Sequence, residues 1–147
     1  MKIYVASSWR NFIQPAVVHT LRRGGHDVYD FRNPPQQAGF GWEEIASDWQ
    51  SWTVDQYRKS LRHPRALEGF AMDRKHVEWC DRLVLVLPCG RSAHLEAGVA
   101  VGLGKPVDAV ILEPCEPELM YLWFDRIIGS MNELMDAYGV GGPEVPL

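Results

Sequence analysis

Short apolar runs alternate along this chain with longer segments in which apolar residues recur at helical spacing. The clearest run covers residues 83–87 and stops at Pro88-Cys89-Gly90, which is typical of a parallel strand buried on both faces. Similar patterns predict strands at residues 2–6, 26–31, 82–88, 107–112 and 126–128. Because helical patterns separate these strands, the chain is predicted to form a parallel sheet with helices on both faces.

The helical segments have recognisable ends. Asn11 is a good N-cap for a helix that runs to Gly24-Gly25, and Pro15 is tolerated only within its first turn. The pattern predicts further helices at residues 54–61, 64–79, 92–103, 116–124 and 131–138. The fold class is therefore α/β, a flavodoxin-like or Rossmann-like three-layer sandwich with a parallel sheet of about five strands.

One segment does not follow this alternation of strands and helices. Pro34, Pro35, Gly39 and Gly41 forbid long regular elements between residues 32 and 53, where several tryptophans are concentrated. Loops of this length inside compact domains are often functional. We predict a single domain over residues 1–147 with a Trp-rich insertion at about 32–64. Its tryptophans either stack on a nucleobase or pack against one another.

Composition narrows the choice of partner. The 147 residues carry 15 basic and 19 acidic side chains, a net charge of −4, which argues against a nucleic-acid polymer as ligand. No apolar run approaches the ~20 residues that span a bilayer, and the first strand is too short for a signal sequence. We expect a cytoplasmic protein without a membrane partner that binds a small molecule.

Cysteine and histidine spacing gives no metal site. The three cysteines are an odd number without close pairing, which favours reduced thiols, and the five histidines lack the spacing of a zinc motif. We therefore expect no metal. Cys89 lies at a strand end without a neighbouring base, so a thiol nucleophile there has little support. His94 is either a solvated helix residue or part of a site, because it lies two residues before Glu96.

Glu96 is the first candidate for chemistry. It follows the strongest predicted strand, at the sheet edge where α/β proteins bind ligands. If Ser92 caps the following helix, Glu96 lies in its first turn, where the helix dipole favours the ionised form that a nucleophile needs. The alternative is that Glu96 only stabilises the helix, since acids are favoured in first turns.

Asp73 is the second candidate. It lies on the stripe of Ala66, Phe70, Val77 and Cys80, so helical spacing aims this acid toward the core. A buried carboxyl without a partner has a raised pKa, which suits a proton donor. The alternative is a carboxylate satisfied by a backbone N–H or by the end of another helix.

The segment after the first strand is polar. Ser7, Ser8, Arg10 and Asn11 bring two hydroxyls, a guanidinium and a helix start together, and such groups bind a phosphate or a sugar hydroxyl. The segment is not a P-loop, because it lacks that spacing of glycines and lysine. The alternative is that the serines and Asn11 are ordinary caps and Arg10 a surface charge.

Together these residues resemble the nucleoside 2-deoxyribosyltransferase-like family, which includes the 2'-deoxynucleoside 5'-phosphate N-hydrolases. The resemblance extends from Tyr4 to about Met135. It rests on Tyr4 in the first strand, Ser8-x-Arg10, Asp73 eight residues before Asp81, Glu96 in Ser-Ala-His-Leu-Glu-Ala-Gly, and the segment Glu116-Pro117-Glu118-Leu119-Met120.

The resemblance implies a specific chemistry. Glu96 would attack the anomeric carbon and displace the base, Asp73 would protonate that base, and Tyr4 would hold Glu96 by a hydrogen bond. Transfer to a second base or hydrolysis would follow, without a metal or cofactor, as in retaining glycosidases. The family builds its sites across a subunit interface, so the resemblance also implies a homodimer or higher homo-oligomer.

The resemblance predicts which bond is cleaved better than it predicts the substrate. Substrate contacts are expected from Ser7, Ser8, Arg10, Gly90, Ser92 and Glu118. Glu118 would repel a 5'-phosphate whereas Arg10 would attract one, so nucleoside and nucleotide both stay open. Two other functions also stay open: an NAD or ADP-ribose glycohydrolase, as in TIR-type domains, and a non-catalytic nucleotide-binding or sensing domain.

Overall fold

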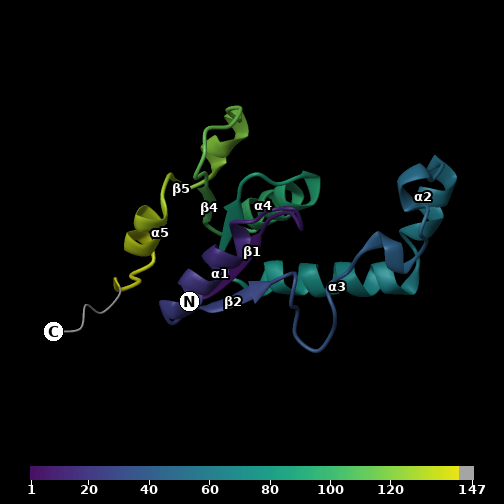
Figure 1. The fold of residues 1–147 in the computed structure, drawn as a ribbon, viewed down its shortest axis with the longest axis horizontal. Coiled ribbons are helices and arrows are strands. Elements are labelled where there is room, and N and C mark those ends of the chain that lie inside the picture. The colour runs from purple at the N-terminus through teal and green to yellow at the C-terminus, as the bar shows by residue number, and fades with distance from the viewer. Residues whose placement is uncertain (143–147) are drawn as a thin grey trace.

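A computed structural model describes residues 1–142, which form a five-stranded, all-parallel sheet (Figure 1). The strands are β1 (Lys2–Ala6), β2 (Asp27–Asp30), β3 (Arg82–Val86), β4 (Val107–Val110) and β5 (Arg126–Ile128), in the order β2-β1-β3-β4-β5. The predicted α/β class is thus confirmed. The strands predicted at 82–88 and 107–112 each end two residues early, because the chain leaves the sheet there to enter the loops at its carboxyl edge.

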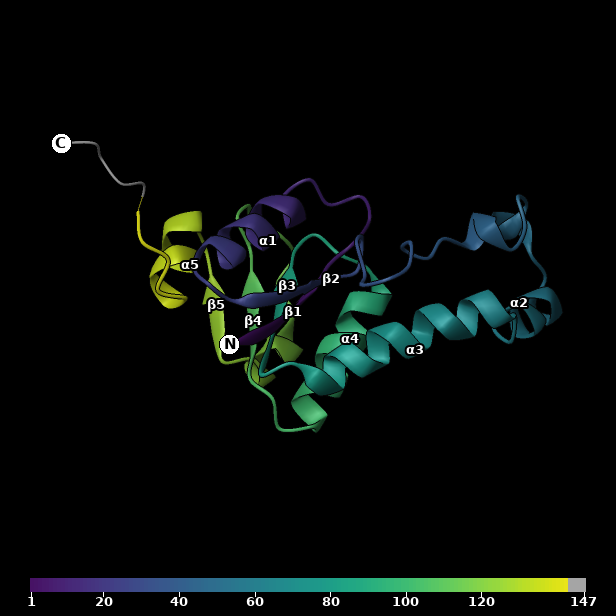
Figure 2. The ribbon, with the colours of Figure 1, turned by 90° about the horizontal axis from the view of Figure 1, so that it is seen from below.

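Helices cover both faces of the sheet (Figure 2). On one face α1 (Gln14–Arg23) and α5 (Met131–Ala137) share an apolar cluster with Ile3 and Val5 of β1. On the other, α3 (Pro64–Trp79) and α4 (Arg91–Gly102) pack on Tyr4 and Ala6. Because successive strand residues point to opposite faces, these two apolar clusters make the three-layer sandwich that the pattern predicted.

Asn11 holds the turn that leads into α1, although the N-cap residue itself is Ile13. Asn11 Oδ1 accepts hydrogen bonds from the backbone N–H groups of Ile13 (2.7 Å) and Gln14 (2.9 Å), and Pro15 lies in the first turn. The Asn11 amide also donates to the carbonyl oxygen of Pro88 (3.0 Å). Asn11 therefore joins the loop after β1 to the turn after β3.

The segment between β2 and α3 forms an arm, defined here as residues 32–63. It contains two short 3-10 helices, η1 (Trp42–Glu44) and η2 (Trp49–Ser51), and the helix α2 (Val54–Ser60). In Figure 2 α2 and the start of α3 extend away from the sheet. Arg65 of α3 holds the arm by donating to Glu44 Oε1 (3.1 Å) and to the carbonyl oxygen of Ala38 (2.9 Å).

The helix predicted at residues 116–124 is wrong in extent and type. The structure has a 3-10 helix, η3 (Leu119–Trp123), preceded by irregular chain. Pro114 and Pro117 explain the difference, because each disfavours helical backbone in the residue before it. The Glu118 carboxylate caps η3 by accepting from the Met120 N–H (2.9 Å). In the described part of the chain, no helix combines the length and apolar character needed to cross a bilayer.

Candidate active site

A cavity of about 720 Å³ opens at the carboxyl ends of β1 and β3. On one side of this point the next strand is β2, and on the other side it is β4, so the order of the strands reverses between β1 and β3. Open α/β sheets bind ligands at such a reversal of strand order. The cavity wall comes from the loop after β1, the start of α4, the middle of α3, and the arm.

The structure brings most of the predicted site residues to this cavity. The predicted residues that line it are Ser7, Ser8, Arg10, Asp73, Gly90, Ser92 and Glu96. Tyr4 lies beneath them, fully buried in the sheet. Glu118 lies outside the cavity of its own chain, so its expected contact with substrate stays a prediction that concerns a neighbouring subunit.

Glu96 does not occupy the helix position that the sequence suggested. The helix α4 begins at Arg91 with Gly90 as its N-cap, so Ser92 is not the cap and Glu96 lies in the second turn. The expected stabilisation of its charge by the helix start is therefore wrong. Burial, and next the nearby Asp73 carboxylate, raise the pKa of Glu96 to about 8. The carboxyl holds its proton at neutral pH.

Asp73 faces the cavity from the predicted stripe of α3, in which Ala66, Val77 and Cys80 are buried as expected but Phe70 is not. Phe70 is 64% exposed, and Gly69 is buried with Ala66 and Val77. The glycine lies where Phe40 of the arm presses on the helix, which leaves no room for Phe70 on that side. Asp73 itself is half-buried, and burial raises its pKa.

Two tyrosines on neighbouring strands support the two carboxyls. Tyr4 of β1 and Tyr29 of β2 are direct partners in the parallel ladder, and their ring centroids lie 5.0 Å apart. The Tyr29 hydroxyl donates to Asp73 Oδ1 (2.7 Å), and this bond opposes the rise in the pKa of Asp73. Asp73 therefore has a side-chain partner, not the backbone or helix end considered from the sequence.

Tyr4 approaches Glu96 without completing a bond. Its buried hydroxyl forms no hydrogen bond of ordinary length within the described residues, although it lies close enough to lower the pKa of Glu96. The predicted hydrogen bond between Tyr4 and Glu96 thus stays a prediction. The role of Tyr29 was not predicted from the sequence. The signal that could have indicated it is its position opposite Tyr4 in the next predicted strand.

The loop after β1 is held by a residue that the sequence did not single out. The Arg32 guanidinium donates to the carbonyl oxygens of Ser8 (2.9 Å), Trp9 (2.9 Å) and Asn11 (2.7 Å). The Ser7 hydroxyl donates to the carbonyl oxygen of Val86 (2.8 Å). Asn11 occupies the start of α1, and the helix whose N-terminus opens on the cavity is α4, so the expected phosphate or sugar contacts of Ser7, Ser8 and Arg10 stay a prediction.

The turn after β3 is positioned by His94. Its Nδ1 donates to the Gly90 carbonyl oxygen (2.8 Å), so its Nε2 accepts from the Tyr121 hydroxyl of η3 (2.8 Å). His94 is therefore not a solvated helix residue. Burial, and next Glu96, raise the pKa of Cys89 to about 12, which opposes a thiolate nucleophile there.

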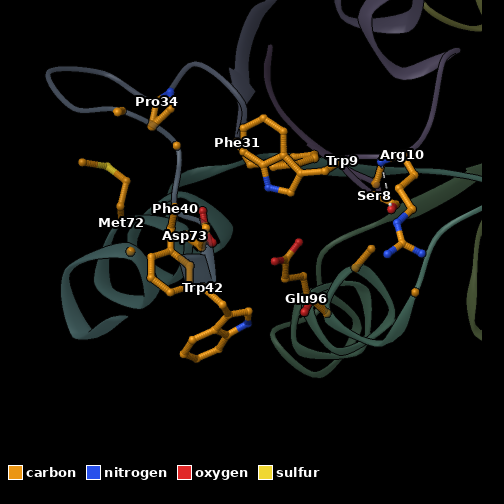
Figure 3. A pocket seen from close by; sticks show the side chains of 18 of the residues that line it. Ser8, Trp9, Arg10, Phe31, Pro34, Phe40, Trp42, Met72, Asp73 and Glu96 are labelled. Carbon is orange, nitrogen blue, oxygen red and sulfur yellow. Dashed lines mark hydrogen bonds between the residues drawn. The ribbon is translucent and has the colours of Figure 1, made fainter. Parts of the chain in front are cut away.

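The cavity has a polar side and an aromatic side (Figure 3). Ser8 and Arg10 lie on one side of Glu96, whereas Phe40 and Trp42 lie on the other, next to Asp73. Among the described residues, no group of three or more histidine, cysteine, aspartate or glutamate side chains is placed to hold a metal ion.

Comparison with solved structures identifies the fold. The 2-deoxyribosyltransferase from the psychrotolerant bacterium Bacillus psychrosaccharolyticus aligns over 91% of this chain and 90% of its own, with a TM-score of 0.59 and 22% identity. The chain has the fold of a 2-deoxyribosyltransferase. The resemblance inferred from the sequence is thus confirmed at the level of the fold.

Two further structures share this deoxyribosyltransferase fold. A conserved protein from Enterococcus faecalis V583 has a TM-score of 0.57 and 16% identity, covering 95% of this chain and 97% of its own. A CMP N-glycosidase from Clostridium botulinum has a TM-score of 0.52 and 14% identity, covering 95% and 99%. Neither a protein-family model nor a curated protein sequence matches the chain.

Proposed function

We propose that this protein cleaves the N-glycosidic bond of a nucleoside or nucleotide, with Glu96 as nucleophile and Asp73 as proton donor. The observation that carries the proposal is the arrangement of two electrostatically coupled carboxyls at one cavity, with a tyrosine beside each. Two proteins with the same fold, a 2-deoxyribosyltransferase and a CMP N-glycosidase, support this class of reaction.

The first step forms a covalent ester. The Glu96 carboxylate attacks the anomeric carbon, the bond from that carbon to the base nitrogen breaks, and its electron pair stays on the base. Asp73 gives its proton to the leaving base. In the second step, water attacks the same carbon while Asp73 accepts a proton, and Glu96 leaves as a carboxylate. A second base in place of water gives transfer.

Before substrate binds, the proton that Asp73 must donate is on Glu96. Glu96 has a pKa of about 8, whereas the bond from Tyr29 favours the ionised form of Asp73. Two close carboxyls share one proton because their negative charges repel. Substrate binding must therefore shift that proton from Glu96 to Asp73, which prepares the nucleophile and the acid together.

The polar side of the cavity favours a 5'-phosphate. Arg10 and Arg91 line it, and the glycine N-cap leaves the first N–H groups of α4 without a side-chain cap. Positive side chains and an uncapped helix start both attract an anion. Glu118, the residue expected to repel a phosphate, does not line this cavity in its own chain, so any repulsion would come only from a neighbouring subunit of the proposed oligomer. A nucleoside 5'-monophosphate is therefore the favoured substrate.

Base release from a mixed panel tests the proposal. Deoxynucleosides, ribonucleosides, their 5'-monophosphates and NAD are each incubated with the protein, and free base is measured by chromatography. Glu96→Ala should abolish release, and Asp73→Asn should reduce it by about 100-fold or more. Glu43→Gln is the matched control, since this carboxyl also lines the cavity, on the arm. Intact substrates across the panel would contradict the proposal.

Two outcomes of this panel would favour other functions. Release of nicotinamide from NAD alone would favour an NAD glycohydrolase. Thermal stabilisation by nucleotides without turnover, unchanged in Glu96→Gln, would favour a binding or sensing domain.

The protein is also proposed to form a homodimer or larger homo-oligomer. Leu95, Val99 and Leu103 form a stripe at helical spacing along α4, and all three are at least half exposed. On η3, Leu122 is 84% exposed. The bond between His94 and Tyr121 joins these two elements, so a second copy covering them would contact the support of the Gly90 turn.

A further inference from the structure

We propose that the aromatic side of the cavity is a leaving-group subsite for a bicyclic, purine-type base. This inference rests on the proposed function and deepens it. In this inference the arm helps to select the base of the substrate, and neither the fold nor the two carboxyls provide that selectivity.

The position of Asp73 gives the orientation of the substrate. Glu96 must face the anomeric carbon, and Asp73 must reach a nitrogen of the leaving base. Asp73 lies beside Phe40 and Trp42, whereas Arg10 lies across Glu96 from them (Figure 3). A nucleotide with its base near Asp73 therefore points that base toward the arm and its 5' group toward Arg10.

The extent of the aromatic wall indicates the size of the base. Five aromatic side chains from the β1 loop, the end of β2 and the arm line the cavity besides Tyr29: Trp9, Phe31, Phe40, Trp42 and Trp49. A single six-membered ring has two faces and covers little of this surface. A fused bicyclic ring covers more of it and removes more apolar area from water. The cavity of about 720 Å³ accommodates such a base.

The arm side of this wall is built before any ligand arrives. Phe40 is seated on Gly69 of α3, where a Cβ atom would lie only 3.0 Å from the Phe40 Cβ. The Arg65 guanidinium lies 5.5 Å from the centre of the Phe40 ring. Binding a base here therefore requires little ordering of the arm, and preorganised surfaces bind more tightly.

The opposite side of the wall is equally fixed. The Trp9 ring rests on Gly39, where a Cβ atom would lie 2.7 Å from the ring. Trp9 also packs edge-on against Phe31, with ring centroids 5.4 Å apart. The arm and the β1 loop thus hold each other in place around the base subsite.

The arm's own packing offers a matched control. Trp42 lies edge-on to Trp52, with centroids 5.7 Å apart, and both belong to the same aromatic cluster. Trp42 lines the cavity but Trp52 does not. If these tryptophans serve only to pack the arm, replacing either has the same effect. If Trp42 stacks on the base, only its replacement changes the choice of base.

Steady-state kinetics with purine and pyrimidine deoxynucleoside 5'-monophosphates test the inference. For the unmodified protein, kcat/KM for purines should exceed that for pyrimidines by about tenfold or more. Trp42→Ala should lower purine kcat/KM about tenfold, mainly through KM, and change pyrimidine values less than about threefold. Gly69→Ala, which displaces Phe40, should act in the same direction. Trp52→Ala should leave the preference unchanged.

A binding measurement separates this inference from the proposed function. In the inert Glu96→Gln variant, dGMP should quench tryptophan fluorescence and bind about tenfold more tightly than dCMP, and Trp42→Ala should remove the difference. Equal binding of the two, or an equal loss for both in Trp42→Ala, would overturn the subsite. Selective binding without any base release would overturn only the proposed reaction.

Discussion

Asp73 and Glu96 carry the same functional group, and their neighbours make them different. Tyr29 donates a 2.7 Å bond to Asp73, whereas Tyr4 approaches Glu96 without completing one. Both carboxyls are affected by burial, which raises their pKa values. Burial, and next the Asp73 charge, keep the proton on Glu96, while the bond from Tyr29 opposes the rise in the pKa of Asp73.

The raised pKa of Glu96 predicts how stability depends on pH. Between its ordinary value of 4.5 and about 8, the folded chain holds a proton on Glu96 that the unfolded chain has lost. Stability should therefore fall as pH rises through this window, by an amount on the order of a few kcal/mol. Glu96→Gln should flatten the dependence. Urea unfolding of both proteins at pH 5 and pH 8 checks this, and equal slopes would contradict it.

Tyr29 is predicted to be a positioning residue for Asp73. Tyr29→Phe removes the bond to Asp73 Oδ1, so the pKa of Asp73 should rise further. The pH limb of kcat/KM that reports Asp73 should move upward. The maximum rate of base release should fall by about tenfold, because the Asp73 carboxyl is no longer held in place. Stability should change by only about 1 kcal/mol. Tyr57→Phe, on the exposed arm, is the control, and an unmoved pH profile would contradict the role.

At the scale of elements, a buried charge joins the last two strands to α5. Asp108 of β4 is fully buried and accepts bonds from Arg82 (2.8 Å), Arg126 (2.6 Å) and the Tyr138 hydroxyl (2.6 Å). These partners come from β3, β5 and the end of α5. The contacts among these elements therefore depend on one carboxylate that the sequence pattern did not single out.

Removing this carboxylate should weaken the fold without reaching the cavity. Asp108→Ala removes the shared partner of two arginines and the Tyr138 hydroxyl, and should lower the free energy of unfolding by about 3 kcal/mol. Asp125→Ala is the matched control. Its carboxylate also contacts Arg82, at 3.4 Å, but is 48% exposed, so the loss should stay below about 1 kcal/mol. Similar losses for the two variants in urea unfolding would contradict this account.

The elements themselves were largely predictable because their signals are local. The apolar run at residues 83–87 and the turn at Asn11 are each decided by a few neighbouring residues. The burial of Phe70 on α3 was predicted wrongly, because Phe40 from the arm packs on Gly69 at that side of the helix. The charge state of Glu96 was not predictable either, since it depends on Asp73 from another helix.

At the scale of the whole molecule, the exposed apolar residues of α4 and η3 predict self-association. The protein should elute with a mass of at least twice that of the 16.7 kDa chain. Leu122→Glu should shift it toward the monomer at little cost to folding, since Leu122 is 84% exposed in the single chain. Val54→Glu, on the arm, is the control. Light scattering that shows a monomer at micromolar concentration would contradict the assembly.

The overall architecture followed from the alternation of strands and helices, and the site followed in part. Glu96 was found from its place after the strongest strand and Asp73 from its helical spacing, whereas Tyr4 came from the resemblance. Tyr29 and Arg32 act through contacts between segments that are distant in sequence, which no local pattern displays. The arm was recognised as unusual, but its place beside Asp73 required the fold.

Among the described residues, the last one to line the cavity is Glu96. Residues 97–142 supply two of the five strands and the α5 side of the core, but no wall of their own chain's cavity. Random mutagenesis should therefore yield two classes of defective variant. Apart from Glu118, the predicted contact with a neighbouring subunit's substrate, changes beyond residue 96 should act mainly through the amount of folded or assembled protein, so lower temperature or higher expression should rescue them. Changes at the cavity wall should resist such rescue.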